Sequence, residues 1–304
     1  MVAQNPSKPD RFPGAMPLRA IVAALSLTLS VVPFAARAAT NEPAEELRNI
    51  ASARTLGMGS AFRATGLGAD ALLGNPAAMA LYPAYRIEGT GAYDPRNKEG
   101  YLGVSLADSS SGRLALGVDY HWLSLGRGGG RTSANLSTLG AALPLSQSLL
   151  IGLSGHYLRL NGQSRFANSI TLDAGILVRM SEQLTLGVSG HNLIDTENVE
   201  QTRYFSAHTA YVGPALVVAF DMRADFETRD SAVFTYNTGA EYVLDQTVPL
   251  RVGYTYDGFQ RLSRLTVGTG YMSPGGGGVD LSYQHDLGGL NGRVLALTLR
   301  ILAN

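Results

Sequence analysis

The sequence predicts an all-β protein, a 14-stranded antiparallel transmembrane β-barrel with an N-terminal hatch. From residue 84 to residue 302, apolar residues alternate with polar residues or glycines, which is the period of a strand with one apolar face. The alternating segments are about ten residues long and are separated by turn residues, as in barrels with an apolar outside and a polar lumen. One face of such a segment carries Leu114, Leu116, Val118, Tyr120 and Trp122.

Residues 1–38 have the features of a signal peptide. Residues 18–33 form an apolar run, Arg19 supplies a positive charge near its start, and Ala36-Arg37-Ala38 is a small-x-small cleavage sequence. The run is shorter than the roughly twenty residues that span a bilayer, which favours cleavage over the alternative of a membrane anchor. Residues 1–15 are predicted to be an upstream extension, with translation starting at Met16.

Residues 39–83 lack the alternation and are predicted to form the hatch. Pro76 pushes Asn75 into an extended backbone conformation. The Asn75 side chain can then cap a short helix whose first position is Pro76.

Residues 84–304 are predicted to form the barrel. Its fourteen strands, an even number as expected for a bacterial barrel, lie at residues 84–93, 99–107, 113–124, 135–143, 149–160, 169–179, 184–193, 203–212, 215–227, 233–244, 248–256, 263–271, 278–286 and 292–302. The three longest connections are predicted to be extracellular loops at residues 125–134, 193–203 and 271–278.

The composition limits the classes of partner. The 24 basic and 24 acidic side chains cancel, which argues against a nucleic-acid partner. The sequence has no cysteine, so disulfides and thiolate metal sites are excluded. The low charged fraction of 16% is typical of a barrel whose outside faces the lipid of an outer membrane.

A soluble lipocalin-like barrel is the main structural alternative, because alternation alone does not say which face is outside. The signal segment, the number of strands and the small or glycine residues on the polar face favour the membrane form.

Charged residues on the polar face form a group of candidates. In the predicted register the lumen charges are Arg86, Glu88, Asp119, Asp173, Arg179, Asp221, Arg223, Asp225, Glu241 and Arg251. One interpretation is a polar track or latch that holds Arg54 and Asp70 of the hatch. The other is a set of charges that are solvated or paired with one another and need no ligand.

The sequence predicts no catalytic residue, no metal site and no cofactor. The five histidines lie on different predicted strands. Ser154 with His156 comes nearest to a hydrolase pair, but both face the lumen, whereas a lipid-modifying enzyme would need them to face the bilayer. Metalloprotease, phosphate-loop and nucleophile-elbow motifs are absent from the sequence.

Three short motifs precede the barrel pattern: Arg-Thr-Leu-Gly-Met-Gly at residues 54–59, Ala-Asp-Ala at residues 69–71, and Gly-Asn-Pro-Ala-Ala-Met at residues 74–79. This ordered set resembles the FadL family of outer-membrane transporters of hydrophobic compounds and its PorV-like relatives. The resemblance implies a 14-stranded barrel whose hatch carries an Asn-Pro-Ala motif. The chain departs from the family in its short loops and in ending without a terminal aromatic residue.

The expected function is passage of hydrophobic or amphiphilic, fatty-acid-like molecules across the outer membrane of a Gram-negative bacterium. The hatch is expected to gate this passage through Gly57, Gly59, Asp70, Asn75, Pro76 and Ala77. One alternative is a barrel that docks a secreted or surface protein, as PorV-like relatives do. The other is an outer-membrane enzyme that modifies lipids.

Overall fold

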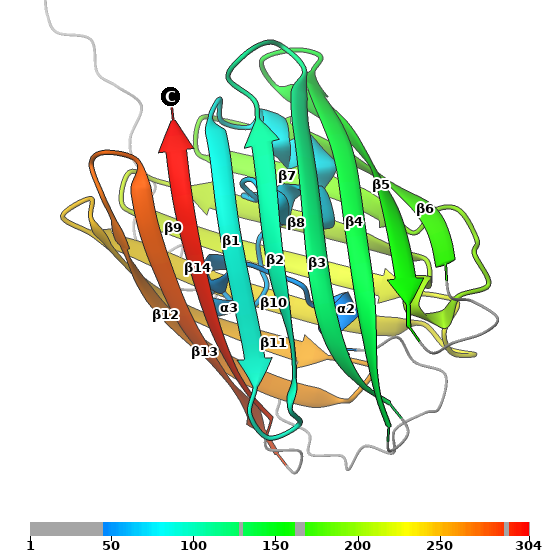
Figure 1. Cartoon of the computed structure of the whole chain (residues 1–304). Helices are drawn as coiled ribbons and strands as arrows, with labels where there is room; N and C mark the ends of the chain where they lie inside the picture. The colour runs from blue at the N-terminus through cyan, green and yellow to red at the C-terminus, as the bar shows by residue number, and fades with distance from the viewer. Residues whose placement is uncertain (1–44, 128–129, 162–167, 289–291, 304) are drawn as a thin grey trace, which may run out of the picture. The chain divides into compact units, whose positions relative to one another are not determined.

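The computed structural model describes residues 45–127, 130–161, 168–288 and 292–303. Its strands form one closed antiparallel barrel in which each strand pairs with its neighbours in sequence and β1 pairs with β14 (Figure 1). The predicted fold class and the fourteen strands are confirmed: β1 (Tyr85–Asp94), β2 (Glu99–Asp108), β3 (Ala115–Arg127), β4 (Gly130–Pro144), β5 (Leu149–Leu160), β6 (Asn168–Arg179), β7 (Leu184–His191), β8 (Tyr204–Val212), β9 (Leu216–Asp225), β10 (Val233–Leu244), β11 (Val248–Asp257), β12 (Leu262–Met272), β13 (Gly277–Leu287) and β14 (Arg293–Ala303). The expected signal peptide at residues 1–38 lies outside the described residues.

Residues 45–83, here called the internal segment, lie within the ring of strands (Figure 1). They contain the helices α2 (Glu45–Arg48), α3 (Ala53–Gly57) and α4 (Ala69–Gly74) and the 3₁₀ helix η1 (Pro76–Ala80). The Asn75 side chain caps η1 by accepting a hydrogen bond from the Ala77 N–H at 3.1 Å, and Pro76 is its first residue, as the sequence predicts. None of the helices in the described part of the chain is long and apolar enough to cross a membrane.

The outer face of the barrel is apolar. Leu102, Leu139 and Leu153 are 62%, 65% and 62% exposed, and such side chains recur on every second residue of the strands. An apolar surface of this extent is unfavourable in water but matches a hydrocarbon environment. The inward-facing Asp119, by contrast, is only 2% exposed. The lipocalin-like alternative is therefore wrong, and the predicted register is confirmed.

The two ends of the barrel differ in their connections. The terminal end, where β1 begins and β14 ends, carries short turns, whereas the opposite loop end carries the long connection between β7 and β8 at residues 192–203. In outer-membrane barrels the short turns face the periplasm and the longer loops face outward.

Of the three predicted extracellular loops, the one at residues 271–278 is wrong, and the one at residues 125–134 is shorter than predicted. Residues 125–134 lie mostly in a hairpin, because β3 continues to Arg127 and β4 already begins at Gly130. Residues 271–278 form a tight turn at the terminal end, between β12 and β13. Runs of glycine suggested long loops at both places, but Gly130, Gly277 and Gly278 are paired in strands.

Candidate functional site

The internal segment meets the barrel wall backbone to backbone. A Cβ atom on Gly253 would lie 2.0 Å from the Gly59 nitrogen, and one on Gly239 would lie 2.1 Å from the Met58 carbonyl oxygen. Gly59 itself has a φ of +62°, a conformation that side chains disfavour. Glycine is therefore required on both sides of this contact, and Gly59 is held against β10 and β11.

The same close approach recurs at Gly57, Pro76 and Ala77. Gly57 lies against Gly268, whose Cβ position is 3.2 Å from the Gly57 Cα. A Cβ on Gly152 would lie 2.4 Å from the carbonyl carbon of Pro76 and 2.3 Å from the nitrogen of Ala77. The wall glycines are therefore covered by the internal segment.

Asn75 links η1 to the wall. It is fully buried, and its Nδ2 lies 2.7 Å from Nε2 of His208 on β8. Because Oδ1 accepts from the Ala77 N–H, Nδ2 is the donor in this pair and His208 Nε2 is the acceptor. A sequence motif identified Asn75, but only the fold brings His208 to it.

Asp70 is bound within the internal segment. Its carboxylate accepts hydrogen bonds from the Ser52 N–H at 2.9 Å, the Ser52 hydroxyl at 2.5 Å and the Thr55 hydroxyl at 2.7 Å. Asp70 thus ties α4 to the start of α3. The latch interpretation, in which lumen charges hold Asp70, is wrong for this residue.

Three ion pairs join the internal segment to the wall. They are Arg48–Asp257 at 3.1 Å, Arg54–Glu241 at 2.9 Å and Arg63–Asp221 at 3.2 Å. Burial lowers the pKa of Arg54, but the carboxylates of Glu241, Asp70 and Asp280 together raise that pKa above its ordinary value, so the guanidinium stays charged. The latch interpretation therefore describes Arg54 correctly.

The other lumen charges are paired or bonded. Two are ion pairs between strand residues, Arg251–Glu241 at 2.6 Å and Arg86–Glu88 at 3.1 Å. Two aspartates contact histidines: Asp119 contacts His121 at 2.7 Å, and Asp173 contacts His156 at 2.8 Å and His191 at 2.7 Å. Arg179 donates to the Leu81 carbonyl, and Asp225 accepts from the Glu227 N–H at 2.9 Å. Arg223 donates to the Arg48 carbonyl at 3.0 Å. Groups of three or more side chains able to hold a metal ion are absent from the described residues.

Several lumen charges on the last strands were not predicted from the sequence. Arg264 bridges Asp257 and Asp286, and Asp280 pairs with both Arg251 and Arg300. These residues continue the inward alternation of β11 to β14, so extending the same register would have found them. The ion pair of Arg63 could not be predicted in this way, because the sequence of the internal segment does not alternate as a strand does.

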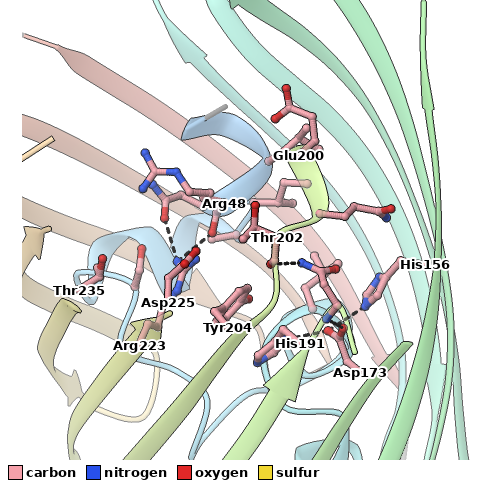
Figure 2. A pocket seen from close by; sticks show the side chains of 18 of the residues that line it. Arg48, His156, Asp173, His191, Glu200, Thr202, Tyr204, Arg223, Asp225 and Thr235 are labelled. Atoms are coloured by element: carbon pink, nitrogen blue, oxygen red, sulfur yellow. Dashed lines mark hydrogen bonds and ion pairs between the residues drawn. The ribbon is translucent and has the colours of Figure 1, made fainter. Parts of the chain in front are cut away.

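A cavity of about 90 Å³ lies at the loop end, beside the internal segment (Figure 2). Its polar lining includes His156, Asp173, His191, Tyr204 and Arg223, and its apolar lining includes Leu47, Ile50, Leu136 and Leu158. The cavity is therefore amphipathic.

The barrel wall is interrupted next to this cavity. β7 pairs with β6 only from Gly190 opposite Ala174 to Thr185 opposite Arg179. Beyond His191, residues 192–203 lie beside β6 in place of a paired strand. They are joined to β6 largely by side-chain hydrogen bonds: the Thr171 hydroxyl donates to the Ile194 carbonyl at 3.0 Å, and Asn198 Nδ2 donates to the Ser169 hydroxyl at 2.8 Å. This part of the wall is held by fewer backbone hydrogen bonds than a regular ladder.

An apolar groove of about 930 Å³ lies on the outside of the same region. Gly190 and Leu193 line the groove, whereas His191 and Asn192 line the internal cavity. At this point a single layer of chain separates the cavity from the outer surface.

Ser189, His191 and Asp173 are in the order of a hydrolase triad. The Ser189 hydroxyl is 2.8 Å from His191 Nε2, and His191 Nδ1 is 2.7 Å from Asp173. The hydroxyl, however, is buried against the Gly74 carbonyl at 3.2 Å, and Ser189 does not line the cavity. The Ser189 hydroxyl is therefore hydrogen-bonded within the protein, whereas His191 and Asp173 line the cavity.

Comparison with known proteins shows similarity in structure. No family model and no curated protein sequence matches the chain. Among solved structures, the toluene transporter TbuX of Ralstonia pickettii has a TM-score of 0.64 at 12% identity, covering 84% of this chain and 98% of that one. The toluene transporter TodX of Pseudomonas putida has a TM-score of 0.62 at 14% identity, covering 83% and 96%.

A FadL homologue of Pseudomonas aeruginosa has a TM-score of 0.58 at 13% identity, covering 82% of this chain and 98% of that one. The fold is therefore that of FadL-like outer-membrane barrels, as the resemblance of the hatch motifs implied. At these identities the comparison establishes the fold alone.

Proposed function

We propose that the protein passes hydrophobic or amphiphilic small molecules, fatty-acid-like ones included, across the outer membrane of a Gram-negative bacterium. The observation that carries this proposal is the pair of spaces on either side of the β6–β7 interruption, an amphipathic cavity inside and an apolar groove outside. The toluene transporters that share the fold support the class of ligand.

In this proposal the ligand enters the cavity from the loop end. The internal segment, held by its glycine contacts and ion pairs, keeps the terminal end closed to water-soluble solutes. The ligand then leaves sideways, between β6 and residues 192–203, into the groove and the hydrocarbon. Gating is thus shared between the hatch residues around Asn75 and the interrupted wall.

A reversible cross-link across the interruption tests the route. Leu172 and Leu193 both face outward, and the Leu193 N–H donates to the Leu172 carbonyl at 2.8 Å. The chain has no cysteine, so the double variant Leu172→Cys/Leu193→Cys holds the only pair of thiols. We expect oxidation to reduce uptake of a neutral aromatic probe into proteoliposomes, and a reductant to restore it.

The matched control is Val104→Cys/Tyr120→Cys, a pair of outward residues directly opposite each other in the regular β2–β3 ladder. Its oxidation should leave uptake unchanged. Full uptake by the oxidised Leu172→Cys/Leu193→Cys variant would exclude the sideways route.

A further inference from the structure

The outward face of the barrel carries a row of three polar side chains across the adjacent strands β4, β5 and β6 (Figure 1). Arg159 of β5 lies directly opposite Asn135 of β4 on one side and Asn168 of β6 on the other. Neighbouring strands are about 4.8 Å apart, so the three Cα atoms span roughly 10 Å. The row is therefore compact enough for its three side chains to bind one small group together.

This polar row lies at the edge of the apolar band, toward the loop end. Arg159 is on the same face of β5 as Leu153 and six residues further along the strand. Six residues extend roughly 20 Å along a strand, or about 15 Å in height at the usual tilt, whereas half of the apolar band is only about 12 Å. Tyr120, Trp122 and Tyr157 also face outward and are 43%, 42% and 40% exposed. Such aromatic residues mark the level of the lipid headgroups, here those of the outer leaflet.

The free polar groups of the row are hydrogen-bond donors. The Tyr120 hydroxyl donates to Asn135 Oδ1 at 2.6 Å, and the Tyr157 hydroxyl donates to Asn168 Oδ1 at 3.1 Å. With both amide oxygens occupied, each amide offers its Nδ2 group, which is a donor only. Neither Nδ2 group nor the Arg159 guanidinium has a partner among the described residues. The row thus combines one cation with two amide donors.

The surroundings of Arg159 supply no counter-charge. None of the outward-facing described residues of β3 to β6 is acidic. Arg203, also at the loop end, differs because it pairs with Glu227 at 3.1 Å. A guanidinium flanked by further N–H donors matches a phosphate, whose several oxygens accept hydrogen bonds at the same time. Phosphates of lipid headgroups are the anions found at this level of a membrane.

We propose that the row formed by Asn135, Arg159 and Asn168 binds the phosphate of an anionic lipid in the outer leaflet. The acyl chains of this lipid lie along the apolar outer face of the barrel next to the row, where Leu153 and Ile170 are each 62% exposed. The lipid is a resident partner of the barrel surface. The site is therefore separate from the internal cavity and does not depend on which molecule the barrel passes.

Titration of the purified barrel in detergent with monophosphoryl lipid A, followed by native mass spectrometry, tests the inference. This probe is a glycolipid with one phosphate, and its phosphate-free counterpart carries the same acyl chains. We expect the phosphorylated lipid to bind at least about tenfold more tightly. Equal affinity for the two lipids would overturn the proposed site. Displacement of the bound lipid by an equal concentration of inorganic phosphate would assign the site to free phosphate and would also overturn the proposal.

Variants of the row test its residues one at a time. Arg159→Gln should lower the affinity for monophosphoryl lipid A about tenfold. Asn168→Asp keeps the shape of the side chain but replaces a donor by an anionic oxygen, so it should lower the affinity by a similar factor. Arg203→Gln is the matched control, because it removes the same charge at the loop end from a residue already paired with Glu227. It should bind the lipid as the unaltered protein does.

Unchanged lipid binding by Arg159→Gln would overturn the proposal. An equal loss in Arg159→Gln and Arg203→Gln would overturn it as well, because net charge alone would then explain the binding. Assembly of each variant is checked by its heat-resistant band on a gel. If Arg159→Gln fails to assemble, the comparison of the two glycolipids on the unaltered barrel still decides.

Discussion

Glycine fixes the position of the internal segment at a few residues of the wall. Gly253 and Gly175 face inward, and a Cβ there would meet the Gly59 nitrogen at 2.0 Å and Asn75 Oδ1 at 1.9 Å. The first contact is with backbone, and the second is with a buried side chain that is already hydrogen-bonded to Ala77 and His208. Glycine is therefore needed at these two positions because the internal segment lies against them, whatever glycine also contributes to sheet curvature.

Gly253→Ala should displace the internal segment and destabilise the barrel by about 1–3 kcal/mol, the usual effect of overpacking. The measurement is the temperature at which the folded band is lost on a gel. Gly89→Ala is the control, because a Cβ there has no atom within 4 Å. Equal melting of both variants would contradict the role assigned to Gly253.

Single residues were only partly predictable from the sequence. The Asn-Pro pair predicted the cap at Asn75, because proline restricts the residue before it. The partners of Arg63 and Arg223 were not predictable, because they depend on how a segment without strand period lies inside the barrel. Asp221 was expected among the lumen charges, but nothing local indicated that it binds the N–H of Phe62.

At the scale of elements, the proposed closure of the terminal end depends on η1, which packs there. Its buried residues Ala77 and Met79 pack with Ala142, Leu150 and Ala210, which lie on β4, β5 and β8 near the terminal end. Asn75 starts this helix and connects it to His208. Asn75 therefore adds a polar link to the apolar packing of η1.

Asn75→Ala should weaken the cap by about 1 kcal/mol and loosen the closure, so that proteoliposomes leak a small sugar faster. Asn198→Ala is a matched control, because Asn198 caps η2 (Val199–Gln201) at the loop end through the Glu200 N–H. That variant should leak no faster than the unaltered protein. Equal leakage through both variants would remove η1 from the closure.

Strands were predictable because one apolar face repeats every second residue. The end of β7 was not: the prediction ran to residue 193, whereas β7 ends at His191. Asn192 has a φ of +55°, and its N–H donates to Asp173 instead of a ladder carbonyl. A side-chain contact with another strand thus creates the interruption, and the local sequence does not encode it.

For the whole molecule, the outward apolar band determines where the barrel resides. Leu153→Arg places a charge in the middle of this band, at a cost of about 2–4 kcal/mol near the bilayer centre. We expect loss of the membrane-inserted, heat-resistant form. Gln147→Arg, in an exposed turn at the terminal end, should insert normally. Normal insertion of Leu153→Arg would show that this face does not contact lipid.

The bond between the Ala53 N–H and the Thr298 hydroxyl, at 2.8 Å, spans 245 residues. The helix α3 also contacts β1 and β11 to β14, so its binding site is not complete until the last strand has been made. The helix α3, which is synthesised before every strand, can consequently reach its final place only after the last strand has been made. Assembly in the membrane must keep this segment inside the growing ring until β1 and β14 join.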